Sequence, residues 1–409
     1  MKELFETISA SWQLSPFWMT VVTVLWLLLI AVAVLAFMAT FAGVTSWAER
    51  RVAGRMMSRI GPNRVGPVGF LQWLADGLKC FLKEDVIPDS VDKTMFRLAP
   101  YLVFPAGFAA FAVLPFGYGL AASNIDIGIF YITAATSIVV IGILMAGWSS
   151  NNKWSLLGGV RSAAQIVSYE IPTGLAILSV VVLAGTLNMH SIIAAQGGWP
   201  WQWFVFNNPF TFVAFFIFFA SILAEGNRTP FDLPEAESEL VAGYLTEYSG
   251  MRFLFFLFTE WANLWVMSAI ITTLFLGGWQ IPGINLGEIM SASVGYVRLF
   301  WILASVVVFW AKTLLFVFVV IWVRWTLPRL RVDQLMIMCW KYFVPIGFVT
   351  VFGASLFVVL PDSGIWHILH TAIKLITMTL GFAIALGILW RAFYNIRSSD
   401  DKIYIKVWE

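Results

Sequence analysis

The stretch "FTFVAFFIFFASILAEGNRTPFDLPEAESEL", residues 210–240, runs from an unbroken apolar segment into a loop rich in acids. A second apolar segment begins soon afterwards, near residue 253. A membrane-spanning helix needs about twenty apolar residues, so the pattern predicts that the loop lies at the edge of a membrane. Between residues 225 and 247 the only base is Arg228, and the six acids are Glu225, Asp232, Glu235, Glu237, Glu239 and Glu247.

The composition of the whole chain is that of an integral membrane protein. Of its 409 residues 60% are hydrophobic and 12% are charged, with a mean hydropathy of +0.84. Soluble domains carry roughly 25% charged residues. A net charge of +2 gives no indication of nucleic-acid binding.

The sequence carries no pattern of residues that would hold a redox centre. Cys80 and Cys339 stand far apart, which argues against a disulfide framework, a zinc site and an iron–sulfur site. His367 and His370 lie at a helix end with nothing nearby that suggests a haem. Neither a dinucleotide-binding nor a phosphate-binding glycine motif is present. We therefore expect no flavin, haem, iron–sulfur cluster or other metal in this chain.

Nine apolar segments are candidate spanning helices, and the first is too long to be a signal-peptide core. The prediction is an all-α integral membrane protein, with one polytopic domain over residues 1–409, eight spans within 1–361, and a ninth span and cytoplasmic tail in 362–409. All but four of the 25 lysines and arginines fall in alternate loops and the carboxyl tail. This asymmetry predicts an amino terminus outside the cell. The segments lie near 18–46, 98–120, 129–148, 163–187, 209–224, 253–278, 298–324, 342–360 and 368–391.

Residues 66–83 predict an amphipathic helix that lies in the membrane interface. Pro67 suits its start. Its apolar stripe includes Phe70, Leu71, Leu74 and Leu78, opposite a polar stripe that includes Asp76. The helix is either an anchor on the membrane surface or the wall of a cavity that opens to lipid.

Four ionisable residues stand inside or near the predicted spans, where a charge costs roughly 2.5–3.5 kcal/mol at the helix centre. For Glu170 and Glu260 we favour a proton or ion path. Lys312 is too deep to reach the surface easily, which favours a functional role or internal pairing. Lys374 lies near a helix end and is expected to extend to the interface.

The acidic loop admits two interpretations. Read as a helix, Asp232, Glu235 and Glu239 share one face, where like charges repel and burial raises carboxylate pKa values. Such a cluster would exchange protons near neutral pH. The alternative is a solvated acidic loop, which is the commoner case. Pro230 and Phe231 stiffen the loop and favour the first interpretation.

Four long motifs, taken together and in order, resemble the respiratory complex I subunit called H in bacteria. The resemblance covers residues from about 20 to 361. The motifs are "ERRVAGRMMSRIGPNRVGPVGFLQWLADGLKCFLKED" (49–85), "GGVRSAAQIVSYEIP" (158–172), "AEGNRTPFDLPEAESELVAGYLTEYSGMRF" (224–253) and "KTLLFVFVVIWVRWTLPRLRVDQLMIMCWK" (312–341).

The resemblance implies a subunit of proton-translocating NADH-quinone oxidoreductase in the bacterial plasma membrane. It implies quinone bound at an interface with a partner subunit. The implied partners are hydrophilic-arm subunits that carry iron–sulfur clusters, and neighbouring small and antiporter-like membrane subunits. By resemblance, the proton path comprises Glu170, Glu225, Asp232, Glu235, Glu237, Glu239, Glu247 and Glu260, with Arg161 beside it; Lys312 is added on the depth argument above. The implied quinone positions are Glu49, Arg50, Arg59, Asp76 and Arg228, with Phe253, Phe70 and Leu71 as candidate wall residues.

Two other functions remain open at this point. Related subunits anchor membrane-bound hydrogenases and dehydrogenases of a deazaflavin cofactor, and a stand-alone cation/proton antiporter belongs to a different class. The absence of two matching broken helices disfavours the antiporter.

Overall fold

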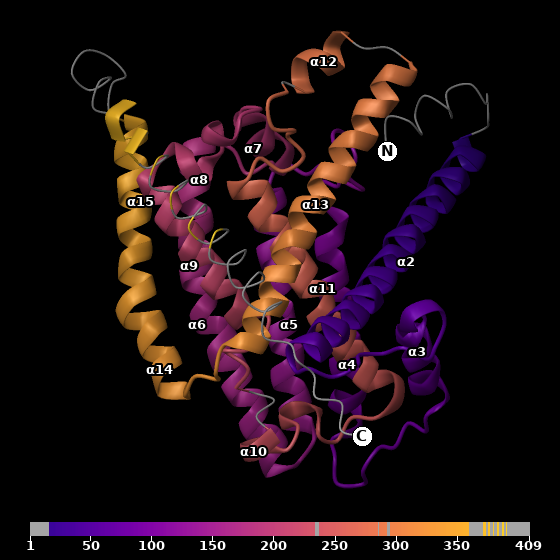
Figure 1. The fold of residues 1–409 in the computed structure, drawn as a ribbon. Coiled ribbons are helices and arrows are strands. Elements are labelled where there is room, and N and C mark those ends of the chain that lie inside the picture. The colour runs from indigo at the N-terminus through magenta and orange to yellow at the C-terminus, as the bar shows by residue number, and fades with distance from the viewer. Residues whose placement is uncertain are drawn as a thin grey trace, which may run out of the picture.

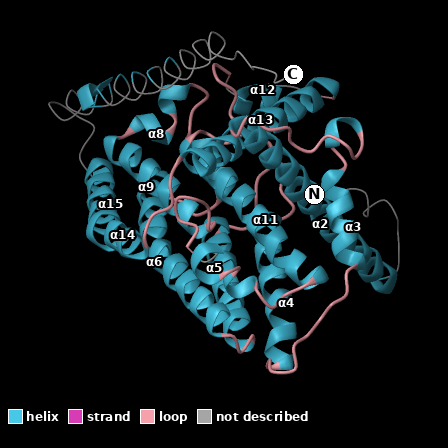
Figure 2. Ribbon diagram, turned by 60° about the horizontal axis from the view of Figure 1, so that its bottom comes forward, coloured by secondary structure: helices cyan, strands magenta, loops and turns pink. Residues whose placement is uncertain are grey.

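A computed structural model of the chain describes residues 16–233, 237–284, 286–292 and 295–359, with isolated positions between 371 and 390. Within these ranges the structure is helices joined by loops (Figures 1 and 2), with one isolated antiparallel bridge between Gly117 and Leu120. The predicted all-helical class is confirmed.

Seven helices in the described residues are long and apolar enough to cross a membrane. Together with a shorter eighth helix between the fourth and fifth of them, they run alternately up and down in Figure 1, so the chain is a multi-pass bundle. An eighth apolar helix, α9 (Pro209–Glu225), is shorter. The seven are α2 (Pro16–Met56), α4 (Lys93–Ala109), α5 (Gly128–Ser149), α6 (Lys153–Ala184), α11 (Gly250–Phe275), α13 (Tyr296–Thr326) and the continuous run of α14 (Val332–Ile337), the π-helix η6 (Met338–Phe343) and α15 (Val344–Val359).

These eight helices correspond to the first eight predicted spans. The ninth, near 368–391, lies for the most part outside the described residues, as do Lys374, His367 and His370. The count of nine and the orientation of the chain therefore stay predictions. The helix α6 begins ten residues before its predicted span, because hydropathy detects only the part of a helix that is apolar enough to cross lipid.

Short elements gather at the two ends of the bundle. We call the end at which α2, α5 and α13 terminate the loop end, and the other the opposite end (Figure 1). The loop end carries η2 (Pro67–Gly69), α3 (Gln72–Leu82), α10 (Glu237–Leu240) and η5 (Gly243–Leu245). The opposite end carries η3 (Ala110–Ala112), α7 (Met189–Ala195), η4 (Pro200–Gln202), α8 (Phe204–Asn207) and α12 (Leu286–Ala292).

Polar side chains set the first residues of several helices. The side chain of Asp92 accepts hydrogen bonds from two backbone amides at the start of α4, and that of Asn152 accepts one, from Trp154, at the start of α6. Asn208 caps α9, whose first residue is Pro209, a residue suited to that position. Gly185 ends α6 in the left-handed conformation.

The predicted amphipathic helix is present, but it begins later than expected. Residues 66–69 include three positive φ angles, at Gly66, Val68 and Gly69, so this stretch, which includes the short turn η2, cannot continue as a regular α-helix. The α-helix α3 therefore starts only at Gln72 and packs against α2 and α11. Its apolar stripe, including Leu78 and Phe81, is exposed. Its contact with a membrane surface stays a prediction.

The chain stops being helical inside the bundle after α9. Residues 226–233 have no helical structure and are nearly all buried. The side chain of Gln165, from the interior of α6, donates to the carbonyls of Ala224 (2.8 Å) and Phe231 (2.7 Å). Irregular backbone at membrane depth is tolerated where protein buries it. The fifth apolar helix is short because it ends at Glu225, where this buried, non-helical segment begins.

A close backbone approach positions the loop that follows. A Cβ at Gly158, in the first part of α6, would lie 2.6 Å from the Cα of Gly243. Gly243 itself has a positive φ of 54°. Glycine at both positions lets η5 rest directly on α6, which places the next residue, Tyr244, inside the bundle.

Candidate functional site

A buried ionic cluster joins three distant segments at the loop end. Glu49, near the end of α2, accepts a 2.5 Å hydrogen bond from Arg324 of α13 and a 3.4 Å one from Arg228 of the buried segment. Glu49 and Arg228 are each 4% exposed. Burying charges is costly unless they pair, so these contacts hold the three segments in one arrangement.

Some polar atoms of this cluster form no hydrogen bond within it. Nε and Nη2 of Arg228 are enclosed and have no hydrogen-bond partner among the described residues. Its guanidinium lies over the ring of Trp261 at 4.3 Å. Asp232 accepts from Arg329 at 3.3 Å through one oxygen, while the other oxygen has no partner in the same part of the chain. Buried polar atoms are normally paired, so a water, a ligand or a neighbouring protein is expected to complete this site.

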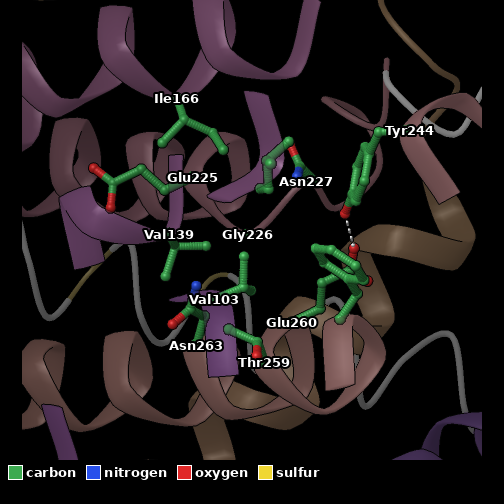
Figure 3. Close-up of a pocket in the computed structure, with 12 residues that line it drawn as sticks. Val103, Val139, Ile166, Glu225, Gly226, Asn227, Tyr244, Thr259, Glu260 and Asn263 are labelled. Atoms are coloured by element: carbon green, nitrogen blue, oxygen red, sulfur yellow. Dashed lines mark hydrogen bonds between the residues drawn. The ribbon is translucent and has the colours of Figure 1, made fainter. Parts of the chain in front are cut away.

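Glu260 extends the cluster into the bundle. It lies on α11, and its carboxylate accepts a 2.9 Å hydrogen bond from the hydroxyl of Tyr244 (Figure 3). Arg228, Asp232 and Arg324 are all within electrostatic reach of Glu260. The carboxylate is therefore tied both to a neutral donor and to the charges around Glu49.

Two further carboxylates lie deeper. Glu225, the last residue of α9, is buried and accepts a 2.5 Å hydrogen bond from Thr173 of α6. Glu170, one turn earlier on α6, is within electrostatic reach of Glu225. Glu170 and Glu260 thus lie within long apolar helices, as predicted, whereas Glu225, predicted as the first residue of the loop, is the last residue of α9.

Glu225 borders two cavities. A small one of about 20 Å³ also has Glu260 in its wall (Figure 3). A larger one of about 510 Å³, between α5, α6, α9 and α11, also has Glu170 in its wall. Hydroxyls of Thr133, Thr136, Ser137 and Thr173 contribute polar groups to the larger cavity. Glu225 is thus the residue shared by the walls of both spaces, and the larger one is also bordered by exposed residues such as Phe130.

Several predicted residues form pairs at the surface of the loop end. Arg50 donates to Asp76 of α3 at 2.6 Å, and Gln72 donates to the same carboxylate. Arg161 pairs with Glu239 at 2.7 Å, and the Glu239 side chain is 61% exposed. Glu247 accepts from Asn152, the cap of α6. These pairs connect α2 to α3 and α6 to the acidic loop.

The expectation that Asp232, Glu235 and Glu239 share one helical face is wrong. Asp232 lies in the non-helical buried segment, and the helix α10 covers only Glu237–Leu240. A proline at position 230 and another at 234 prevent a continuous helix. Glu235 and the side chain of Glu237 lie outside the described residues.

Lys312 is held apart from the carboxylates. Its ammonium donates to the carbonyls of Leu276 (2.8 Å), Gly278 (3.0 Å) and Gln280 (2.9 Å), just past the end of α11. Leu276 lies about 24 Å from Glu260 along α11, at 1.5 Å per residue. Of the two roles left open for Lys312, the contacts favour internal pairing.

Arg59 and Phe253 also lie away from the Glu49 cluster. Arg59 lines a 260 Å³ hollow with Arg51 and Arg55 beyond the end of α2. Phe253 packs against the buried group that includes Phe256 on the α4–α5 side of α11. Phe70 contacts Trp47 edge to face at 5.4 Å.

Arg324 and Arg329 belong to the site, although the sequence did not single them out. As basic residues of a predicted inner loop they contributed only to the expected orientation. Only their positions in the sequence could have drawn attention to them. Arg324 falls in the last turn of a spanning helix, and Arg329 follows a proline in the same motif. Nothing in the linear sequence indicated that the two arginines meet Glu49 and Asp232.

The chain matches known proteins over most of its length. A family profile described as "NADH dehydrogenase" matches residues 28–355. The H subunit of NADH-quinone oxidoreductase from Anaeromyxobacter dehalogenans is 56% identical over 94% of both chains. The chain belongs to the family of NADH-quinone oxidoreductase H subunits.

Other relatives have the same assignment. The H subunit from Dehalococcoides mccartyi is 44% identical over 94% of this chain and 98% of its own. NADH-quinone oxidoreductase subunit 8 of Rhodothermus marinus is 47% identical over 82% of this chain and 98% of its own. The resemblance drawn from the four motifs is therefore confirmed: the chain is a multi-pass membrane subunit of NADH-quinone oxidoreductase, rather than a hydrogenase anchor or a stand-alone antiporter.

The similarity to the Anaeromyxobacter protein also reaches the carboxyl-terminal region. Residues 1–361 alone are too few to make up the 94% of 409 residues that align with that protein. Part of residues 362–409 is thus shared with this relative.

Proposed function

We propose that this subunit forms the membrane side of a quinone-binding chamber at the loop end, and that its carboxylates couple quinone reduction to proton movement. Quinone is expected to bind between this chain and a hydrophilic-arm subunit. We expect quinone reduction to be coupled to proton movement in the neighbouring small and antiporter-like membrane subunits.

The cluster around Glu49 supports the chamber. A quinone has a polar head and an apolar tail, and its site requires a few polar groups in an apolar wall. Arg228 offers two buried N–H-bearing atoms without partners, and Asp232 offers one unpaired oxygen, among the described residues. The exposed apolar stripe of α3, which packs on α2, provides a surface along which an isoprenoid tail can approach.

The shared position of Glu225 is the observation that carries the coupling. Residue Glu225 lines the small cavity with Glu260 and the large one with Glu170, while its carboxylate points away from the small cavity (Figure 3) and accepts from Thr173. We propose that protons pass between the three acids through waters in these spaces. A change of charge near Arg228 acts directly on Glu260, so quinone chemistry at the chamber reaches the first member of the chain.

The test compares Glu225→Gln with Asp89→Asn in assembled complexes. Asp89 is a fully exposed acid at the loop end that pairs with the neighbouring Lys93, at 3.7 Å. We expect Glu225→Gln to lower quinone-linked turnover and proton translocation together, by about 100-fold if proton transfer limits the rate, and Asp89→Asn to leave both unchanged. Wild-type rates of both in a fully assembled Glu225→Gln complex would refute the proposal.

A further inference from the structure

The chain just after α3 is fastened to the start of α11 by three separate features, of which two are polar. Arg252 of α11 pairs with Asp85, three residues beyond the end of α3, at 3.0 Å. The hydroxyl of Ser249 accepts from the amide of Val86 at 3.1 Å and donates to the carbonyl of Glu84 at 3.3 Å. These contacts join two segments that lie about 160 residues apart in the sequence.

The third feature is a close approach of the two backbones at Gly250, the first residue of α11. A Cβ at this position would lie 3.2 Å from the carbonyl oxygen of Lys83, and the φ angle of the residue is 57°. Glycine accepts both the close approach and the positive φ. We call residues 84–86 together with residues 249–252 the latch.

The ion pair of the latch is partly enclosed by protein. The side chain of Arg252 is 12% exposed and that of Asp85 is 43% exposed. The guanidinium lies 5.9 Å from the centre of the Phe96 ring, and its Nη1 is enclosed without a hydrogen-bond partner among the described residues. A cation in such surroundings depends on its counter-charge, so the pair holds the two segments more firmly than an exposed pair would.

The body of α3 is fastened to α2, beside which it lies at the loop end (Figure 1). Arg50 of α2 donates to Asp76 of α3 at 2.6 Å. The ring of Trp73 packs on Gly43 of α2, where a Cβ would overlap it. Arg50 directly follows Glu49 of the buried ionic cluster. The helix α3 is therefore a strap that is tied to α2 along its length and to α11 at its end, with its apolar stripe exposed.

We infer that the latch positions α3 for entry of the apolar quinone tail, with Arg252 and Asp85 as a positioning pair. The inference rests on the proposed function, in which the exposed stripe of α3 is the surface along which the tail approaches. With both ties in place, the stripe keeps one orientation relative to α2 and α11. With the latch broken, α3 can turn about its contacts with α2, and the stripe no longer keeps that orientation.

This role predicts a particular kinetic signature. Neither side chain of the pair belongs to the cluster around Glu49, so the reduction of a bound quinone head does not depend on them directly. Weaker capture of the tail raises KM, whereas kcat is unchanged, because the lost contacts are the same in the bound substrate and in the transition state. A quinone with a short tail covers little of the stripe and is affected least.

The test measures kcat and KM of assembled complexes in vesicles for two quinones that share one head group. One has a long isoprenoid tail and the other a single isoprene unit. For Arg252→Ala we expect KM for the long-tailed quinone to rise about fivefold, the upper range for an ion pair that is partly exposed. We expect kcat with both quinones, and KM for the short-tailed one, to stay within about twofold of the wild-type values.

Two further variants control the comparison. Arg252→Asp combined with Asp85→Arg restores the pair with its charges exchanged, and we expect it to recover most of the lost KM. Lys93→Ala removes an exposed pair with Asp89 at the same end of the bundle, and is expected to have no effect.

The outcomes separate the latch from the proposal beneath it. An unchanged KM in Arg252→Ala, an equal rise for both quinones, or no recovery in the exchanged pair overturns the role of the latch. Arg228→Ala is measured in parallel, because it acts on the head group and is expected to lower turnover of both quinones. Wild-type turnover of both in Arg228→Ala overturns the proposed chamber itself.

A milder variant and a second measurement keep the inference testable if Arg252→Ala does not assemble. Ser249→Ala removes only the hydroxyl that joins Glu84 and Val86, and we expect it to raise KM for the long-tailed quinone about threefold. Hydrogen exchange of the backbone amides of α3 is expected to be faster in this variant than in the wild-type complex, with that of α4 unchanged. Wild-type exchange in α3 together with a wild-type KM overturns the inference.

Discussion

The loop end and the opposite end of the bundle both bury charge, but they neutralise it differently. At the loop end Glu49 pairs with Arg228 and Arg324, so each charge is balanced by another ionisable side chain. At the opposite end Lys312 is held by three backbone carbonyls and by the face of Trp203 at 4.1 Å.

The difference supports the proposal that the loop end is the reactive region and the opposite end a structural one. Carbonyls at the carboxyl end of a helix carry partial negative charge and cannot accept a proton from solution. Lys312 therefore completes α11 and the turn after it. Carboxylates that share arginines can change protonation when a neighbouring charge changes. The loop end also retains polar atoms without partners among the described residues, on Arg228 and Asp232.

The largest effect is expected from a substitution within the charge cluster of the loop end itself. Arg228→Ala removes two potential contacts to a quinone head, while Glu49 keeps Arg324 as a partner. We expect quinone reduction to fall by about 100-fold, the loss of 2–3 kcal/mol that removing a hydrogen bond to a charged group produces. Reduction of a soluble acceptor by the hydrophilic arm is expected to stay nearly intact. An equal loss of both activities would show failed assembly instead.

A smaller effect is expected deeper in the chain of acids. Glu170→Gln leaves the quinone chamber untouched and removes the carboxylate on the far side of the large cavity. We expect quinone-linked turnover and proton uptake to fall together by about tenfold, less than the value of a fully required acid–base group. The measurements are the separate rates of quinone reduction and of proton uptake in reconstituted vesicles. Loss of pumping with full quinone turnover would place Glu170 beyond the coupled step.

Lys312→Met sharpens the comparison at the opposite end. The substitution removes three hydrogen bonds of a charged group to the end of α11, each worth about 1.5–3 kcal/mol at most. We expect less assembled complex and a lower thermal midpoint, with normal proton translocation per assembled complex. Impaired translocation in fully assembled complexes would assign the opposite end a direct part in the proton path.

Glu239→Gln tests whether the exposed part of the acidic loop matters. Its pair with Arg161 is solvent-exposed, and such pairs contribute roughly 0–1 kcal/mol. We expect translocation within about twofold of the wild-type rate, a much weaker effect than that of Glu225→Gln. Comparable losses in the two variants would show that the whole loop acts as one proton-binding unit.

The smallest expected effect is a dependence of stability on pH, caused by a histidine at the opposite end. Burial lowers the pKa of His190 in α7, which stacks near Trp279 with ring centroids 4.9 Å apart. The unfolded chain binds a proton at this residue below pH about 6.5, and the folded chain resists it. Stability is therefore expected to fall as the pH drops below that value, and less so in His190→Gln. Thermal midpoints of both complexes at pH values of about 5.5 and 7.5, on either side of the ordinary histidine pKa, provide the measurement.

Part of this structure follows from the sequence alone, because it depends on local composition. Apolar runs of sufficient length must cross the bilayer as helices. The two-sided pattern of residues 66–83 predicts an amphipathic helix there, of which Gln72–Leu82 is α-helical in the structure. Acids embedded in apolar runs, such as Glu170 and Glu260, are expensive enough to indicate function before any contact is known.

Only the tertiary structure decided which charges meet. Glu49 lies 179 residues from Arg228 and 275 from Arg324, and no local pattern links such positions. The burial of Asp232 depends on the non-helical segment that follows α9, whose carbonyls at Ala224 and Phe231 accept hydrogen bonds from Gln165 of another helix. Lys312 donates to backbone carbonyls rather than to an acid because the end of α11 lies beside it. The energy of a charge depends on its neighbours in space, and those neighbours exist only once the helices have packed.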